Sequence, residues 1–407
     1  MRRLALATTI PLLLAALALG CAGATTPADT DGGGGDAAAA DRPLADDSAV
    51  QADAPADAPT QTDARTDAPA QTDARADAPA QQDALAQQDA PAQQDAPTVT
   101  NLTIAIDSDI AEAGRTQNGR AVAALISGHT PAPVALLLGG DNARYGGSGG
   151  LLSYYNTYYK PATEANFGQF DAIAFPAAGN HEYNETSAQG YFDYFATRFT
   201  AMAALPTYHG EAGTVGKGWY SVDLNGWHIV SLNSNCTAIT GGCAAGGAQD
   251  QWLASDLAAH PGMPTIAVWH APRWTCAAAI TGHGSDAALQ SFWARLYDAK
   301  ADFVFSGHNH FYQRMKPLNK ALPAVVDAAN GLTQIVAGSG GVSPYLPCDN
   351  GAGQPSDARV EKQIGGEAGA GAFFMTLGSN GSYSFEYRVK SDGSVFDSGS
   401  GLSHNAH

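Results

Sequence analysis

Residues 303–314 read FVFSGHNHFYQR, an apolar run that is followed at once by two histidines one residue apart. If the chain leaves a strand after Phe305, His308 and His310 can both face one polar site. Neutral imidazole is the commonest metal ligand among protein side chains. The pair alone is a weak signal, because a His-x-His sequence also arises by chance. Its interpretation therefore depends on the residues upstream.

Four more polar groups follow apolar runs in the same way. The runs are 102–106, 134–138, 172–175 and 266–269, and the polar residues after them are Asp109, Asp141, Asn180 with His181, and His270. Polar groups at the carboxyl ends of successive strands form the ligand site of an open α/β sheet. The set combines carboxylates, an amide oxygen and imidazoles, which suits a pair of divalent or trivalent ions better than a closed structural zinc.

This ordered set resembles the calcineurin-like metallophosphoesterases, in the branch close to purple acid phosphatases, over residues 102–310. The resemblance implies two metal ions of the Fe, Zn or Mn type. It implies that one ion is held by Asp109, Asp141 and His310. It implies that the other shares Asp141 as a bridge and is held by Asn180, His270 and His308. It also implies that His181 faces the leaving group of the substrate.

Two positions depart from the family pattern. Ser108 stands where the family usually has glycine, so Asp107 is an alternative ligand, although the Asp-Ile-Ala run favours Asp109. Purple acid phosphatases have a tyrosinate three residues after the bridging aspartate, whereas Tyr145 lies four residues after Asp141. Either the turn bulges and Tyr145 is a ligand, or Tyr145 is no ligand and the purple charge-transfer colour is absent.

Further residues near these motifs are candidates for contact with the substrate. His181 is expected to protonate or hold the leaving oxygen, or else to support Asn180. Arg273, three residues after His270, faces a phosphate oxygen or lies on the surface. His283 contacts the substrate or is a solvated loop residue. Four histidines without a motif around them are interpreted as structural or surface residues: His129, His209, His228 and His260.

Residues 1–20 have the pattern of an export signal. Arg2 and Arg3 precede an apolar segment that is too short to be kept as a membrane span. The segment ends in Leu-Ala-Leu-Gly before Cys21, which looks like a bacterial lipobox. We expect cleavage before Cys21 and a lipid on that residue, with an ordinary signal peptide as the alternative. An exported lipoprotein of the cell envelope, in contact with a membrane through its lipid, is the implied location.

Residues 21–98 are rich in Asp, Ala, Pro and Gln and have no aromatic residue. Such a segment cannot bury enough apolar surface to offset the entropy of ordering, so we predict a disordered tether. The chain has a net charge of −18, and residues 24–98 hold 15 Asp against 3 Arg, so most of the acidity belongs to the tether. The rest is mildly acidic, which argues against nucleic-acid binding by a basic face.

Four cysteines remain when Cys21 is set aside, and they allow three pairings. Cys236 and Cys243 close a short Gly-rich loop, so we pair them, which leaves Cys276 with Cys348. Four free thiols is the alternative, and it is less compatible with an exported protein.

Residues 99–407 are expected to form one catalytic domain. Strand signals alternate with helix signals at 116–126, 187–198, 247–258 and 286–298, and strand signals follow at 334–336, 373–377 and 383–389. Asn225-Gly226 between two apolar runs predicts a type I′ hairpin. The pattern suggests two packed mixed β-sheets flanked by helices, and the resemblance implies the same αββα sandwich.

The first functional hypothesis is a phosphomonoesterase, similar to acid phosphatases, that uses a metal-bound hydroxide and acts on a small phosphorylated substrate. The second hypothesis is a phosphodiesterase or nucleotidase on the same scaffold. A non-catalytic surface adhesin belongs to another class, and the retained ligand set argues against it.

Overall fold

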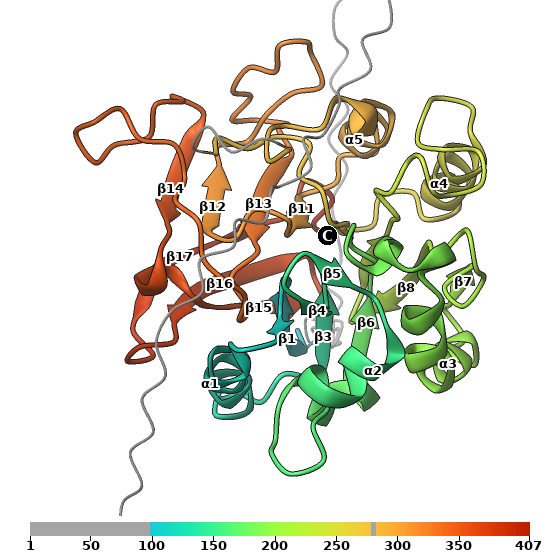
Figure 1. The fold of residues 1–407 in the computed structure, drawn as a ribbon. Coiled ribbons are helices and arrows are strands. Elements are labelled where there is room, and N and C mark those ends of the chain that lie inside the picture. The colour runs from blue at the N-terminus through green and yellow to red at the C-terminus, as the bar shows by residue number, and fades with distance from the viewer. Residues whose placement is uncertain (1–97, 278–281) are drawn as a thin grey trace, which may run out of the picture. The chain divides into compact units, whose positions relative to one another are not determined.

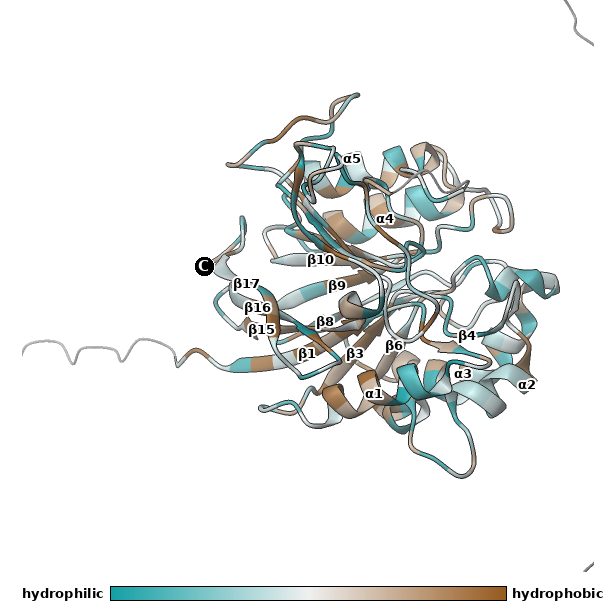
Figure 2. Ribbon diagram, turned by 60° about the vertical axis from the view of Figure 1, so that its left-hand side comes forward, coloured by the Kyte–Doolittle hydropathy of each residue, from teal (hydrophilic) through white to brown (hydrophobic). Residues whose placement is uncertain are grey.

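The computed structural model describes residues 98–277 and 282–407, which form two large β-sheets packed face to face with helices on both outer sides (Figure 1). Figure 2 shows the layers: α4 (Ala248–Ala259) and α5 (Gln290–Asp298) cover one sheet, and α1 (Thr116–Ser127) and α3 (Gln189–Ala203) lie on the side of the other. This is the predicted αββα sandwich. The expected signal segment and nearly all of the expected tether lie outside the described residues.

The first sheet has six strands in the order β17-β16-β15-β1-β3-β6. Its strands are β1 (Asn101–Asp107), β3 (Ala135–Leu138), β6 (Ala174–Pro176), β15 (Gly371–Gly378), β16 (Ser382–Val389) and β17 (Val395–Leu402). β1, β3 and β6 are parallel, and β15 to β17 add an antiparallel half.

The second sheet has eight strands in the order β14-β12-β13-β11-β10-β9-β8-β7. Its strands are β7 (His209–Gly210), β8 (Tyr220–Leu224), β9 (Trp227–Ser231), β10 (Thr265–Val268), β11 (Phe303–Ser306), β12 (Tyr312–Met315), β13 (Thr333–Ala337) and β14 (Val360–Ile364). The central strands β9, β10, β11 and β13 are parallel. Parallel strands end at one edge, so the loops after β10 and β11 are neighbours.

Shorter elements surround the two sheets. A third, small sheet joins β2 (Ala111–Glu112), β4 (Ala143–Tyr145) and β5 (Ser148–Gly149). The remaining helical segments are α2 (Leu152–Tyr154), a π-helical turn at Tyr155–Tyr159 and 3₁₀ turns at Phe167–Ile173, Glu182–Asn184, Thr186–Ala188, Ala287–Leu289 and Glu367–Gly369. None of the described helices is long and apolar enough to cross a membrane.

Alternation along the central strands divides the core in two. Ile266 and Val268 of β10 belong to the apolar cluster that also contains Ile104 and Ile106 of β1, between the sheets. Ala267 points the other way and joins the cluster under α4 and α5. Because successive side chains of a strand face opposite sides, a buried parallel strand needs apolar residues at every position. This is why the strands read as continuous apolar runs.

Most expected elements are present with small shifts at their ends. Asn225 and Gly226 both have positive φ, 51° and 81°, which confirms the type I′ turn between β8 and β9. The helix expected at 286–298 begins as a 3₁₀ turn and becomes α5 only at Gln290. β12, β14 and β17 were not predicted. Both expected disulfides are present: the shorter joins Cys236 to Cys243, and the longer joins Cys276 to Cys348.

Candidate metal centre

The six expected metal ligands lie in one cluster, in the loops after β1, β3, β6, β10 and β11. These strands end at a common edge of the two sheets, where loops from both can meet. Asp109, Asp141, His270 and His310 are almost completely buried, each at most 1% exposed. Ligand atoms of Asp109, Asp141 and His270 all lie within 4.8 Å of one another.

Three of the ligands have a left-handed backbone. The φ angles are 57° at Asp109, 51° at Asp141 and 67° at His308. This conformation is uncommon for residues other than glycine, and it costs free energy that the surroundings must offset. Strain of this kind gathers where side-chain direction matters, and here it turns three ligands toward the same point.

One half of the cluster surrounds the amide oxygen of Asn180. This oxygen lies 3.0 Å from His270 Nε2 and 2.8 Å from His308 Nδ1. His270 Nε2 also lies 3.3 Å from Asp141 Oδ2. The other half consists of His310 and Asp109, whose Nε2 and Oδ1 atoms are 3.3 Å apart.

The second ring nitrogen of each histidine lies against a backbone carbonyl. His270 Nδ1 is 2.8 Å from Gly139 O, His308 Nε2 is 3.0 Å from Gly282 O, and His310 Nδ1 is 2.6 Å from Ser343 O. Each of these nitrogens must therefore carry the proton and donate it, so the inner nitrogen of a neutral ring holds a lone pair.

Each inner nitrogen therefore faces an oxygen that is itself an acceptor. Such pairs repel unless a proton or a metal ion lies between them. The buried Asp109 Oδ1 has no hydrogen-bond partner, which leaves it available as a ligand. The donor set and its orphaned oxygen thus fit metal ions.

Without metal, the histidines of the cluster differ in their pKa. Burial lowers the pKa of His270, but Asp141 outweighs burial and raises it to about 9. Burial would raise the pKa of Asp141, but His270 brings it well below its ordinary value. Burial, followed by the His270 charge, lowers the pKa of His308 to about 4. Burial and the proton on His270 together keep the neighbouring His308 neutral.

Glycines allow the ligand loops to touch. A Cβ added to Gly307 would lie 1.8 Å from Ser108 Oγ and 2.4 Å from Asp109 Oδ2. One added to Gly179 would lie 2.1 Å from Asp141 Oδ1. Both distances are below any real contact, so the main chains of these loops are closer than a methyl group permits.

His181 lies at the rim of the cluster and is held there by its neighbours. Its backbone N–H donates to Asp141 Oδ1 at 2.9 Å. Arg144 Nη1 lies 3.1 Å from His181 Nε2, and Arg144 Nη2 lies 3.0 Å from Glu112 Oε1. Burial lowers the pKa of His181 more than Asp141 raises it. While Arg144 donates to it, Nε2 is an acceptor, so proton donation from this atom requires that contact to open.

Glu182 supports the turns that carry the ligands. Its carboxylate is fully buried and accepts hydrogen bonds from the backbone N–H groups of Gly179, Asp141 and Asn142, at 2.6, 2.9 and 2.8 Å. The Tyr155 hydroxyl donates to it at 2.9 Å. Burial raises the pKa of Glu182 to about 7. One side chain thus ties the turn after β3 to the turn after β6.

Of the less certain candidates, His283 is brought to the cluster and two others are not. The His283 ring stacks on His308 with centroids 4.5 Å apart. Tyr145 is 58% exposed, stacks on Tyr154 and lies at a tilt to Tyr158. Its phenol is therefore packed against other tyrosines at the surface.

Arg273 differs from both expectations, since it is neither at the cluster nor on the surface. It is 3% exposed, donates to Gln290 of α5 at 2.9 Å and lies over the Trp274 ring at 3.7 Å. Its side chain therefore serves the packing of α5.

Asp107, the alternative ligand, is buried beside the cluster but outside it. Ser108 N donates to Asp107 Oδ1, and burial raises the pKa of Asp107 well above its ordinary value. Asp109 is the aspartate that meets His310. The structure therefore favours Asp109 as the ligand from this loop.

Two residues of the cluster were not predicted from the sequence. Arg144 holds His181, and the Tyr345 ring stacks on His310 with centroids 4.0 Å apart and planes 15° apart. Arg144 had a usable signal, because it follows Asp141 by three residues. Tyr345 had none, since it lies in a loop without a motif.

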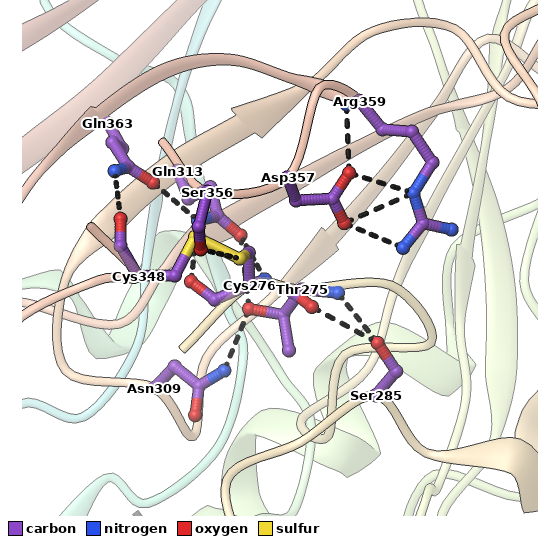
Figure 3. Close-up of a disulfide and its surroundings, with 10 residues drawn as sticks. All are labelled: Thr275, Cys276, Ser285, Asn309, Gln313, Cys348, Ser356, Asp357, Arg359 and Gln363. Carbon is purple, nitrogen blue, oxygen red and sulfur yellow. Dashed lines mark hydrogen bonds and ion pairs between the residues drawn. A yellow bond between two sulfur atoms is a disulfide. The ribbon is translucent and has the colours of Figure 1, made fainter. Parts of the chain in front are cut away.

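Figure 3 shows the longer disulfide beside the loop that carries His308 and His310. Asn309 Nδ2 donates to Thr275 Oγ1 at 2.9 Å, and Gln313 Oε1 accepts from the backbone N–H of Cys276 at 2.8 Å. The loop after β10 and the loop after β11 are thus fastened to each other next to the ligands.

Comparisons with known proteins identify the family of the chain. A family model described as calcineurin-like phosphoesterase matches residues 102–312. Purple acid phosphatase 22 of Arabidopsis thaliana is 30% identical over 204 residues, which cover 47% of this chain and 43% of that protein. Purple acid phosphatase 1 of Ipomoea batatas is 28% identical over 191 residues, which cover 44% of this chain and 38% of that protein. The chain thus spans less than half the length of these relatives.

A solved structure extends the similarity in fold. The chain titled GAP50, the anchor in the inner membrane complex of Plasmodium, matches with a TM-score of 0.50 at 14% identity, covering 74% of this chain and 89% of that chain.

Proposed function

This chain belongs to the calcineurin-like phosphoesterase family, and from that premise we propose that it is a metal-dependent phosphoester hydrolase that acts on phosphomonoesters at a centre for two metal ions. The observation that carries the proposal is the convergence of three inner histidine nitrogens on acceptor oxygens that lie 2.8–3.3 Å away. A proton on His270 fills its contacts without metal, and metal ions would fill the whole set.

The ligands divide into two sets that share one carboxylate. Asp109 and His310 would hold one ion, and Asn180, His270 and His308 would hold the other. Asp141 would bridge them, because its carboxylate lies among ligand atoms of both sets. Two ions bound there would activate a water molecule for attack and neutralise charge on the phosphoryl oxygens.

The chain's own residues would position the ester and handle the proton. His181 Nε2 would release Arg144 and hold or protonate the leaving oxygen. The His283 ring, stacked on His308, would contact the substrate. No side-chain nucleophile is required in this arrangement.

We also propose that residues 99–407 are the catalytic domain of an exported protein, held to a membrane by a lipid on Cys21 through the tether. Two disulfides support export, because disulfides persist mainly in oxidising compartments.

Metal analysis of the full-length protein, with paired assays on p-nitrophenyl phosphate and bis(p-nitrophenyl) phosphate, tests the proposed activity. We expect bound metal, and faster turnover of the monoester. His308→Ala should remove one ion and nearly all turnover, whereas His404→Ala, a histidine paired with Asp302 elsewhere, should change neither.

Three outcomes would contradict the proposal in different ways. Wild-type rates in the His308→Ala variant would refute the metal assignment. Faster turnover of the diester would favour a phosphodiesterase. No metal and no turnover after addition of Fe, Zn and Mn would favour a non-catalytic role.

A further inference from the structure

A second cluster of histidines and aspartates lies at the other end of the eight-stranded sheet. Asp223 and His228 face each other across the β8–β9 hairpin, and Asp256 and His260 come from α4 and its C-terminal cap. Ligand atoms of Asp223, His228 and His260 lie within 4.8 Å of one another. None of these residues belongs to the candidate metal centre.

The protonation of His228 is determined by Asp256. Asp256 is fully buried, its Oδ1 accepts a hydrogen bond from Ser221 Oγ at 2.9 Å, and the same oxygen lies 2.7 Å from His209 Nδ1. His228 Nε2 lies 3.0 Å from Asp256 Oδ2 and must donate to it. The lone pair of Nδ1 in a neutral ring then faces Asp223 Oδ1 at 2.8 Å. This contact is filled either by a proton on Nδ1, which makes the ring an imidazolium between two carboxylates, or by a metal ion.

His260 presents a lone pair to the same point. Its Nδ1 lies 2.7 Å from the backbone oxygen of Asp256 and donates to it, so Nε2 is the acceptor. This Nε2 lies 3.9 Å from Asp223 Oδ2, too far for a hydrogen bond. The rings of His228 and His260 stack with centroids 3.9 Å apart, and two protonated rings would repel at that distance.

A proton on His228 Nδ1 serves only its contact with Asp223 and leaves His260 Nε2, on a side chain that is 20% exposed, to solvent. Within residues 98–277 and 282–407, the ion pairs of Asp223 and Asp256 are with histidines, and no Lys or Arg lies within ion-pair distance of either. A divalent ion would satisfy all three converging atoms.

We propose that Asp223 together with His228 Nδ1 and His260 Nε2 forms a separate binding site for a divalent cation of the zinc type. Two imidazoles and one carboxylate are ligands that zinc prefers, with solvent in the remaining position. Asp256 stands behind His228 as the carboxylate that fixes the ring, which is the usual support of a metal-bound histidine.

The site is accessible, and its ligands would need small movements to bind one ion. The side chains of Asp223 and His260 are 21% and 20% exposed, whereas His228 is fully buried. Zinc held at about 2.0–2.2 Å from each ligand atom sets neighbouring ligand atoms about 3.3 Å apart. His228 Nδ1 and Asp223 Oδ1 would therefore separate by about 0.5 Å, and the stacked His260 ring would tilt toward the ion and approach Asp223 by about 0.6 Å. Such an ion would fasten the β8–β9 hairpin to α4.

The test counts zinc per chain in the full-length protein after equilibration with zinc and removal of the excess. We expect His260→Ala to bind one zinc fewer than the wild type. His209→Ala is the matched control, because His209 also pairs with Asp256, at 2.7 Å, but is outside the ligand set; it should bind the wild-type number. The comparison is a difference between variants, so it holds whether or not the other centre binds zinc.

A second variant guards against misfolding. Asp223→Asn should also bind one zinc fewer than the wild type. Zinc should raise its melting temperature by less than it raises that of His209→Ala. Turnover of p-nitrophenyl phosphate should be unchanged in His260→Ala and Asp223→Asn. Equal zinc counts in His260→Ala, Asp223→Asn, the control and the wild type would overturn the proposal and leave the cluster as a protonated ion-pair network.

Discussion

Glu182 offers the most direct test of how the metal ligands are held. Its carboxylate accepts three backbone N–H groups, from Gly179, Asp141 and Asn142, and the Tyr155 hydroxyl. Glu182→Gln replaces one acceptor oxygen by a donor. If the new NH2 group points toward Tyr155, the Tyr155 hydroxyl can rotate to accept from it. The backbone N–H of Asn142 then has no acceptor. An unsatisfied buried donor costs about 1–3 kcal/mol, so we expect a loss of that size in the free energy of unfolding.

Glu182→Ala should be more harmful, because it leaves all three N–H groups without their acceptor. At about 1–3 kcal/mol each, with some relief from water entering the space, the loss should be about 3–5 kcal/mol. Metal affinity should fall about 10–100-fold in both variants, since the carboxylate orients the turn of Asp141.

Urea unfolding in EDTA measures the first quantity, and metal titration of the folded protein measures the second. Glu185→Gln is the control: it lies three residues further on and accepts one backbone N–H, from Gly190. It should change the free energy of unfolding by less than about 1 kcal/mol and leave metal affinity unchanged. If Glu182→Gln and Glu182→Ala matched this control, the carboxylate would not be what holds the two turns together.

Three further outcomes follow from features away from Glu182. Burial would raise the pKa of Asp250, but hydrogen bonds from Arg295 lower it to about 2, below the ordinary value of 3.8. The ionised carboxylate therefore stabilises the fold above pH 3.8, and this stabilisation is lost as pH falls through 2. In urea unfolding, Asp250→Asn should therefore lose about 1–3 kcal/mol at pH 7, and the difference should be small at pH 2 and vanish below it. Replacing Cys276 and Cys348 by serine should lower the free energy of unfolding by about 4.4 kcal/mol, because their disulfide closes a loop of 72 residues. Replacing Cys236 and Cys243, which close a loop of 7, should lower it by about 2.4 kcal/mol in the same urea unfolding. Any visible absorption band of the metal-loaded protein should survive Tyr145→Phe, because that phenol is exposed; its loss in an absorption spectrum would make Tyr145 a ligand.

The positions of the ligands were predictable because they depend on local signals. An apolar run followed by a polar residue identifies the carboxyl end of a buried strand, and parallel strands bring such ends together. Asp141, His270 and His308 follow from that rule. The αββα layers were predictable for the same reason, although β17 and the short strands β12 and β14 were not, since their pairing depends on distant partners.

The surroundings of the ligands could not be predicted in this way. Arg273 follows His270 by three residues, yet its side chain turns away under α5, because spacing in a loop does not determine which side of the sheet a residue faces. Tyr345 reaches His310 from a distant loop, whose backbone N–H at Tyr345 donates to His310 O at 2.8 Å and which the longer disulfide also fastens. Whether Tyr145 is a ligand was left open, because its spacing from Asp141 differs from the family pattern by one residue. The backbone of β4 turns its side chain outward.

The glycine contacts have a consequence for laboratory evolution of this protein. Because Gly307 and Gly179 meet neighbouring loops more closely than a methyl group allows, even the smallest side chain there would displace Asp109 or Asp141. The inner wall of the site therefore has almost no sequence freedom. New substrate preferences would have to be selected in the outer ring, at positions such as His283 and Tyr345, where side chains border the ligands without carrying them. Mutational libraries confined to that ring would sample far fewer inactive variants.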